Sequence, residues 1–470
     1  MPFPDTDLQA LISADPAGAR PLRAVRSEDL EPFLAALPAA DAAWLRATGW
    51  KAASGDARLV PAPDGRAAGA VVGLGSASAR RRDRFALAAA PAVLHGGTWR
   101  LEGVDDPEAR EEAALAWLLA TYRFDRYRIP SDRSAPPALV CPDGVDPARI
   151  AAIAAAEGLT RDLINTPASD MGPDELEIAL REVAGRFGAT VSATRGDDLL
   201  AANFPMIHAV GRASPRAPRL LEMTWGATGP ALTLVGKGVC FDTGGLDLKP
   251  SASMLLMKKD MGGAANVMGL AQAIMALALP LRLRVLIPAV ENAVGGNAFR
   301  PRDILTSRKG LTVEVNNTDA EGRLVVADAL ALACEGGAPD LLVSMATLTG
   351  AARTAVGPDL APFFTDDDGV AAALDRGAAR VRDPVWRLPF WEPYEAMIEP
   401  GIADLDNAPA GGMAGAITAA LFLRRFVEAP RYLHFDIYGH QPAAAPGRPK
   451  GGAGQGARAL LDALPEVLGL

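Results

Sequence analysis

Two stretches of the chain concentrate side chains that could do metal chemistry. Residues 235–267, VGKGVCFDTGGLDLKPSASMLLMKKDMGGAANV, and residues 315–330, VNNTDAEGRLVVADAL, place carboxylates, lysines and an arginine beside glycines, after apolar runs. A buried ionised group is costly unless it is paired or bound to a metal. Several carboxylates that converge on one place repel one another, and a cation relieves this repulsion. Oxygen-rich ligation without histidine suits divalent ions such as Mn²⁺, Mg²⁺ or Zn²⁺.

The spacing within each stretch supports this interpretation. If the backbone of the second stretch is extended, Asp319, Glu321 and Arg323 project from one face, because strand side chains repeat every two residues. Two carboxylates could then reach a metal with a guanidinium beside them. A glycine pair follows closely after each of Asp242 and Asp260, and glycine lets the backbone turn sharply so that a short carboxylate reaches inward.

Each of these residues also has a simpler interpretation. Asp260 and Asp319 could be the N-caps of helices that follow them. Lys237 and Lys249 could be solvated loop lysines, and Cys240 is better explained as a small buried side chain than as a nucleophile. All of these simpler interpretations would have to hold together for the site to vanish, so the sequence favours a metal site.

Strand and helix patterns alternate along the part of the chain that carries these stretches. This alternation predicts a largely parallel sheet covered by helices on both faces, with ligands bound beyond the carboxyl ends of its strands. The predicted strands are 187–193, 206–211, 219–225, 231–236, 283–289, 311–316, 340–346 and 432–437. The predicted helices are 173–186, 263–278, 324–335, 369–381 and 414–427. Both polar stretches follow predicted strands, where that rule expects a site.

At 470 residues the chain is too long for one hydrophobic core, so we expect two domains. Residues 1–145 are predicted to form a small α/β N-terminal domain, and residues 146–470 an α/β catalytic domain with a mainly parallel sheet. Between them, RIPSDRSAPPA at 128–138 has the composition of a linker. A strand at 67–74 and a helix at 107–122 are expected in the first domain.

Composition and charge exclude several classes of function. The net charge of −9 argues against broad attraction to nucleic acid or to an anionic membrane. Three scattered cysteines form neither a disulfide framework nor a CxxC zinc site, and a reducing cytoplasm suits them. The N-terminal residues lack a signal-peptide pattern, and no apolar run reaches the length of a membrane span. We therefore expect a cytoplasmic protein.

A metal site of this kind is compatible with several functions. A phosphatase could use a similar metal cluster, and a regulator could keep the fold without activity, although no ligand is lost here. A phosphate loop at Lys237 would need GxxxxGK[ST], whereas Gly238 follows the lysine. A zincin-type protease is the weakest alternative, because the chain contains no HExxH.

The two stretches resemble the signatures of the leucyl aminopeptidase, or cytosol aminopeptidase, family of dinuclear metallopeptidases. NTDAEGRL at 317–324 and GKGVCFDTGGLDLKP at 236–250 match its two best-known motifs. Further similarity occurs in LINTPASDMGP (163–173), ATLTGA (346–351) and PAGGMAGAITAALFLRRF (409–426). The resemblance covers most of residues 150–470, whereas the first 145 residues are much less recognisable.

The resemblance implies a role for each matching residue. Asp242 and Glu321 would bridge two divalent ions, Mn²⁺ or Zn²⁺; Asp319 would complete one site, and Asp260 with the amine of Lys237 the other. Lys249 and Arg323 would be the catalytic pair. The residues that hold the first residue of the substrate would be Met257, Thr347 and Gly350.

The resemblance also implies a reaction and an assembly. A two-metal-activated hydroxide would remove the N-terminal residue, leucine or another apolar residue, from peptide substrates. Bicarbonate held by Arg323 would move the proton, since guanidinium binds a planar oxyanion through two parallel hydrogen bonds. The family usually forms homohexamers, and the N-terminal domain would then serve assembly or restrict access to the site.

Overall fold

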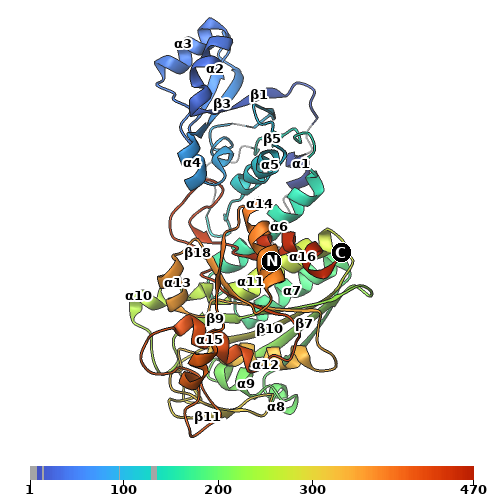
Figure 1. Ribbon diagram of the computed structural model, residues 1–470, viewed down its shortest axis with the longest axis vertical. Coiled ribbons are helices and arrows are strands. Elements are labelled where there is room, and N and C mark those ends of the chain that lie inside the picture. The colour runs from blue at the N-terminus through green and yellow to red at the C-terminus, as the bar shows by residue number, and fades with distance from the viewer. Residues whose placement is uncertain (1–7, 13–14, 95, 129–134) are drawn as a thin grey trace. The chain divides into compact units, whose positions relative to one another are not determined.

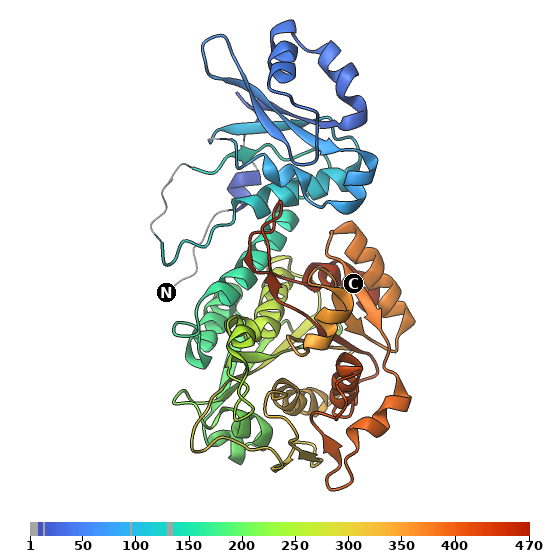
Figure 2. The same cartoon turned by 90° about the vertical axis from the view of Figure 1, so that its left-hand side faces the viewer.

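The computed structural model describes residues 8–12, 15–94, 96–128 and 135–470, so residues 129–134 of the linker-like segment lie outside it. The chain divides into two compact units (Figures 1 and 2). The larger unit contains Leu159–Pro442 and Gly451–Leu470. The smaller unit contains the N-terminal part of the chain up to Gly158, together with Ala443–Lys450. The division therefore falls within α6 (Pro147–Asn165).

The smaller unit is built on a five-stranded sheet in the order β2-β3-β1-β4-β5. The strands are β1 (Arg20–Arg26), β2 (Ala57–Pro61), β3 (Ala67–Gly75), β4 (Thr98–Glu102) and β5 (Ala138–Leu139). The helices are α1 (Leu8–Ile12), α2 (Leu30–Ala36), α3 (Ala39–Ala47), α4 (Ala77–Arg82) and α5 (Pro107–Thr121). Figure 2 shows α2 and α3 in blue at one end of this unit. Part of the core forms where Leu34, Leu45 and Trp50 pack with Val71 of β3.

The larger unit is built on a nine-stranded sheet in the order β15-β14-β17-β13-β8-β10-β7-β6, with β9 paired to β10. The strands are β6 (Thr190–Arg195), β7 (Arg219–Trp225), β8 (Ala231–Gly236), β9 (Gly238–Asp242), β10 (Arg282–Asn292), β13 (Leu341–Ala346), β14 (Ala361–Phe364), β15 (Val385–Leu388) and β17 (Tyr432–Asp436). The central strands β17, β13, β8 and β10 run parallel, and their side chains are almost all buried. This burial explains why they read as continuous apolar runs.

Helices cover both faces of this sheet (Figure 1). One face carries α7 (Pro173–Phe187), α11 (Gly262–Ala276) and α16 (Ala457–Leu468); the other carries α9 (Pro205–Gly211), α12 (Gly322–Cys334) and α15 (Gly415–Arg424). All but the last residue of α11 are buried, and its glycines and alanines let it lie close to the strands. The predicted α/β fold with a mainly parallel sheet between helices is confirmed.

Shorter elements complete the larger unit. A three-stranded sheet joins β11 (Ile304–Thr306), β12 (Thr312–Glu314) and β16 (Leu405–Asp406), and β18 (His440–Gln441) pairs with β19 (Gly451–Gly452). The remaining helices are α8 (Asp198–Ala201), α10 (Ser251–Met254), α13 (Gly350–Val356), α14 (Asp368–Arg380) and the 3-10 helices η3 (Met257–Met261) and η4 (Glu392–Ile398).

One predicted strand is wrong. Residues 206–211 form α9, which begins at Pro205 and buries Met206, Ile207 and Val210. A short apolar run that is buried on most sides fits a strand or a helix equally well by periodicity. The proline decides in favour of the helix, because its fixed φ suits the first helical turn.

Candidate functional site

The polar residues of the two stretches meet at the carboxyl edge of the central parallel strands. Lys237 follows β8 directly, and Asp242 is the last residue of β9. Asp260 lies on η3, which leads into α11, while Glu321 immediately precedes α12. Both helices begin at this edge, so segments about 80 positions apart in sequence deliver side chains to one place.

Three carboxylates form the centre of the site. Asp242, Asp319 and Glu321 each offer an oxygen atom, and these atoms lie within 4.8 Å of one another. Asp242 and Glu321 are at most 2% exposed, so water does little to relieve the repulsion between them. Among the described residues, Oε2 of Glu321 has no hydrogen-bond partner. Buried carboxylates in this arrangement suit a divalent cation.

Lys237 lies between Glu321 and a fourth carboxylate, that of Asp260. Its Nζ lies 2.7 Å from Oδ2 of Asp260 and 3.0 Å from Oε1 of Glu321, and donates to the carbonyl of Thr347 at 3.1 Å. Burial alone would lower the pKa of Lys237, but the carboxylates of Asp260 and Glu321 raise it above its usual value. A neutral, ligating lysine therefore depends on the positive field of divalent cations nearby.

The side chain of Lys237 can come this close to Glu321 because Gly322, at the start of α12, has no side chain. A Cβ added to Gly322 would lie 2.5 Å from Cε and 2.6 Å from Nζ of Lys237. Any larger residue at this position would therefore displace the ammonium group from the site.

Lys249 contacts the other two carboxylates. Its Nζ lies 2.8 Å from Oδ2 of Asp242 and forms an ion pair with Oδ1 of Asp319. Burial and the neighbouring Asp242 carboxylate raise the pKa of Asp319 to about 6, and the same two causes raise the pKa of Glu321 well above its usual value. Both shifts reflect carboxylates that are withdrawn from water and lie close to another carboxylate.

Arg323 lies near the carboxylates, but it projects from a helix and not from the extended segment that we predicted. Residues 318–319 form a turn and α12 begins at Gly322, so the expected extended segment is wrong. Arg323 instead projects from the first turn of α12, where it is 8% exposed and its Nε has no hydrogen-bond partner among the described residues. Burial lowers the pKa of Arg323 to about 10, although Asp436, Glu321 and Asp406 oppose the shift.

The simpler capping interpretations fail. The N-cap of α11 is Met261, and the N-cap of α12 is Glu321; neither uses a side chain as a cap. Asp260 accepts instead from the hydroxyl of Thr347 at 2.8 Å. Lys237 and Lys249 are not solvated loop lysines, because their side chains are 4% and 12% exposed.

The three expected substrate-binding residues lie on segments next to the carboxylates. Thr347 follows β13 and donates to both the carboxylate and the backbone carbonyl of Asp260. Met257 begins η3, which also carries Asp260, and Gly350 begins α13. Met257 is half-buried and Gly350 is exposed.

Three further buried residues support the site, and the sequence analysis missed all of them. The side-chain amide of Asn292 donates to Oδ1 of Asp242 at 2.9 Å and to the carbonyl of Thr318 at 3.1 Å. Asp436 accepts from the amides of Leu348 and Thr349, both at 3.0 Å, and Asn407 binds the loop that carries Asp319. Each of the three ends or directly follows a strand, and that position was the available signal.

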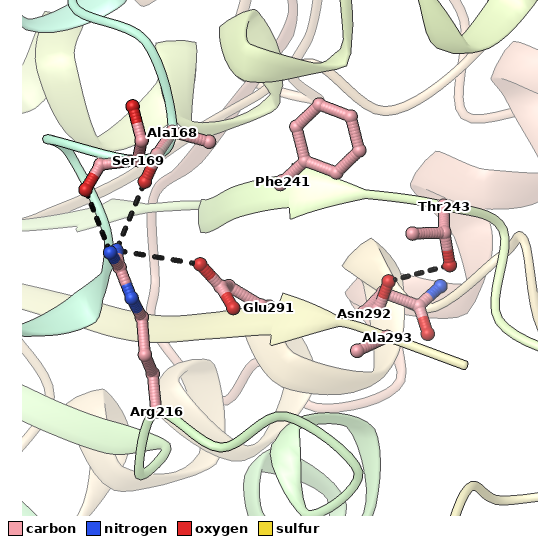
Figure 3. Close-up of a pocket in the computed structure, with 8 residues that line it drawn as sticks. All are labelled: Ala168, Ser169, Arg216, Phe241, Thr243, Glu291, Asn292 and Ala293. Atoms are coloured by element: carbon pink, nitrogen blue, oxygen red, sulfur yellow. Dashed lines mark hydrogen bonds and ion pairs between the residues drawn. The ribbon is translucent and has the colours of Figure 1, made fainter. Parts of the chain in front are cut away.

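A pocket of about 250 Å³ lies beside the last residues of β9 and β10. Figure 3 shows Phe241, Thr243, Glu291 and Asn292 among its eight lining residues, which include none of the predicted site residues. The guanidinium group of Arg216, another lining residue, donates to the carbonyls of Ala168 and Ser169 and lies 3.6 Å from the carboxylate of Glu291. The charge of this arginine is therefore already compensated.

Family models match both parts of the chain. The model for "Cytosol aminopeptidase family, catalytic domain" matches residues 158–461, and that for "M17 aminopeptidase, N-terminal domain" matches residues 20–142. A probable cytosol aminopeptidase of Roseiflexus castenholzii is 42% identical over 366 residues, which cover 74% of this chain and 74% of the relative. That of Syntrophotalea carbinolica is 38% identical over 403 residues, covering 82% and 79%.

Solved structures give the same result over nearly the whole chain. The cytosol aminopeptidase of Coxiella burnetii matches with a TM-score of 0.91 and 41% identity, covering 97% of this chain and 98% of that one. The bottromycin maturation enzyme BotP in complex with Mn matches with a TM-score of 0.86 and 35% identity, covering 94% and 98%. None of the described helices could span a bilayer. The chain therefore belongs to the cytosol aminopeptidase family of metal-dependent peptidases.

Proposed function

We propose that this aminopeptidase removes an N-terminal leucine or another apolar residue from peptides with the help of two divalent ions, Mn²⁺ or Zn²⁺. The residues that would hold the ions are Asp242, Asp260, Asp319, Glu321 and Lys237. The observation that carries the proposal is the group of three carboxylates whose oxygens lie within 4.8 Å of one another. The Mn complex of BotP supports manganese as one of the ions.

Divalent ions at this place would supply Lewis-acid polarisation of the scissile carbonyl and lower the pKa of a water molecule toward neutrality. The remaining work falls to the side chains around them. Lys249, whose ammonium group reaches both Asp242 and Asp319, would stabilise negative charge that develops on the carbonyl oxygen. Thr347 orients the Asp260 carboxylate through its hydroxyl group.

Arg323 has the properties of an anion site. Its guanidinium is buried, and no ion pair or hydrogen bond from it occurs among the described residues. A planar oxyanion such as bicarbonate fits the two parallel N–H groups and would supply a proton acceptor. The four ligand carboxylates are unsuited to this task, because they would be needed to hold the ions.

The first residue of the substrate would lie among Met257, Thr347 and Gly350. Met257 lies on the same 3-10 helix as Asp260, and Thr347 is hydrogen-bonded to Asp260. A substrate residue whose side chain is held there would have its α-amine near the ions. Methionine is flexible and polarisable, which suits apolar side chains of different shapes. This arrangement supports the preference for leucine and other apolar residues.

Assembly and location complete the proposal. We expect a homohexamer with active sites facing a shared interior, and an N-terminal domain at 1–145 that serves assembly or limits access. The names of the relatives as cytosol aminopeptidases support action in the cytoplasm.

Metal analysis and a substrate panel test the proposal together. The purified chain should contain or bind two divalent ions per subunit and, with added Mn²⁺, hydrolyse leucyl and methionyl amides but not phosphate esters. Glu321→Gln removes the charge of one carboxylate and should abolish both amide hydrolysis and binding of the second ion. Phosphate-ester hydrolysis without amide hydrolysis would show a phosphatase instead.

A further inference from the structure

A pair of short parallel strands brings Asn407 next to the loop that carries Asp319. β12 pairs with β16 in parallel, with Val313 opposite Leu405 and Glu314 opposite Asp406. The pairing extends by one more bond, from the amide of Asn407 to the carbonyl of Glu314 at 3.1 Å. Because parallel strands end at the same edge, the residues that follow β12 and β16 emerge side by side.

The side chain of Asn407 makes four hydrogen bonds to the backbone of that loop. Its Oδ1 accepts from the amides of Asn316 at 2.8 Å and Asn317 at 3.3 Å. Its Nδ2 donates to the carbonyls of Asn317 at 2.7 Å and Ala320 at 3.2 Å. Asn407 is fully buried, so water is not available to replace these bonds.

These bonds fix the backbone on both sides of Asp319 and directly before Glu321. We propose that Asn407 is a positioning residue of the metal centre, which holds the loop so that the Asp319 and Glu321 carboxylates converge. The proposal rests on the proposed function, since it takes these two residues as ligands. A residue that orients metal ligands without touching the ion typically contributes 10- to 100-fold to metal affinity.

The opposite side of the centre is fixed by other contacts. The amide of Lys237 donates to the carbonyl of Met345 at 3.0 Å, and Thr347 holds the Asp260 carboxylate. Neither contact involves Asn407. Loss of the Asn407 amide should therefore weaken most the ion that depends on Asp319. The ion that depends on Asp260 and Lys237 shares only Glu321 with this loop and should be weakened less.

Asn407→Asp is the most specific variant. It keeps the shape of the side chain and the two hydrogen bonds that Oδ1 accepts, and replaces the donor Nδ2 by an oxygen. That oxygen would face two carbonyls in a buried place, which is unfavourable. Asn407→Ala removes all four bonds without adding charge, and serves if the aspartate variant does not fold. The matched control is Asp404→Ala, which breaks the bonds from the amide and hydroxyl of Thr312, both at 2.8 Å, in the same small sheet.

The measurement is a titration of metal-free protein with Mn²⁺, with free Mn²⁺ counted by electron paramagnetic resonance. The original chain and Asp404→Ala should bind two ions alike. The Asn407 variants should bind one ion about 10- to 100-fold more weakly and the other with a clearly smaller loss of affinity. Turnover should return at correspondingly higher Mn²⁺, because mass action refills the weakened site.

Two results would overturn the inference. The Asn407 variants could bind both ions like the original chain, or could lose affinity for both equally together with a lower melting temperature of the metal-free protein. The second result would show general loosening of the unit. An original chain that binds fewer than two ions would contradict the two-metal proposal itself, which is a separate failure.

Discussion

Lys237 and Lys249 divide the four carboxylates of the site between them. Lys237 pairs with Asp260 and Glu321, and Lys249 pairs with Asp242 and Asp319. Two positive and four negative charges leave a net charge of −2 in a largely buried place. Burial, together with the neighbouring Asp242 carboxylate, raises the pKa values of Asp319 and Glu321 despite the two lysines. The residual charge favours divalent cations, and a centre of this kind needs no histidine ligand.

At the same scale, Arg323→Ala should lower turnover about 100-fold, the usual contribution of proton transfer by a positioned group, while the metal content stays at two ions. The reason is that Arg323 projects from α12 beside the carboxylates without being a ligand. Steady-state rates with a leucyl amide and metal analysis of the same sample give both numbers. Arg323→Lys keeps the charge but not the planar fork and should recover only part of the rate. Loss of both ions in the alanine variant would contradict the assignment.

The carboxylates that meet at the site were predictable from sequence, because the two stretches that carry them combine acidic residues with glycines after apolar runs. The supporting residues were not. Asn407 acts on a loop about 90 positions earlier, and nothing in its own neighbourhood, ADLDNAP, marks it as more than a turn residue. Its role depends on the pairing of β12 with β16, which are too short to be recognised by periodicity.

At the scale of the elements, most of the sheet and its helices could be predicted. Strands β7 and β8 match their predicted ranges, since they are buried runs between turn residues. The exceptions have physical reasons. Residues 206–211 are short enough to fit a strand or a helix. The alternating polar side chains before α12 predict an extended segment, but this alternation also occurs where a turn leads into a helix.

Gly322 of α12 lies against the side chain of Lys237, which follows β8, so we expect Gly322→Ala to inactivate the enzyme. The added Cβ would lie 2.6 Å from Nζ of Lys237, so the amine must move, and a displacement of about 1 Å can cost 100-fold in rate. Thermal unfolding should change little, because alanine suits the first turn of a helix. Gly185→Ala is the matched control: its Cβ meets nothing within 4 Å, and it should stabilise α7 by about 0.5–1 kcal/mol without affecting activity. Normal activity of Gly322→Ala would show that Lys237 is not needed at this place.

A cluster of charges fixes α7 to the edge of the sheet. Glu177 lies on α7 and pairs with Arg181 of the same helix, with Arg195 of β6 and with Arg219 of β7. Burial alone would raise the pKa of Glu177, but the hydrogen bonds from the three arginines lower it to about 2. The ionised form is therefore favoured in the folded protein relative to the unfolded chain.

This shift predicts how the cluster affects stability with pH. A lowered pKa contributes stability above the unfolded value of 4.5, and this contribution is lost as the pH falls toward 2. Glu177→Gln should cost about 3 kcal/mol at pH 7, since it leaves buried Arg219 without this partner. The difference in melting temperature between the two proteins should shrink steadily from pH 5 to pH 3.5. Glu222→Gln, which breaks a more exposed pair with Arg284, should cost at most about 1 kcal/mol. An equal difference at all pH values would contradict the account.

For the whole molecule, metal binding and folding of the larger unit should be linked. The proposed ligands come from segments that start after β8 and after β12 and lead into α11 and α12, helices that cover opposite faces of the same sheet. Ions that bind only the folded arrangement stabilise it by about 2.7 kcal/mol for each site when the free ion exceeds its dissociation constant 100-fold. The largest effect should fall on the larger unit, which contains all the ligands.

Removal of metal with a chelator should therefore abolish activity and lower the melting temperature, and added Mn²⁺ should restore both. In a calorimetric scan that resolves two transitions, only one should move with Mn²⁺, because the smaller unit contributes no ligand. Glu321→Gln should reduce this shift, since it replaces a buried carboxylate at the centre of the site by a neutral amide. If both transitions move equally, the two units unfold as one, and the shift then measures the stability of the entire chain. If neither moves while Mn²⁺ still restores activity, binding must be too weak to couple to folding, which would contradict a site preformed by buried carboxylates.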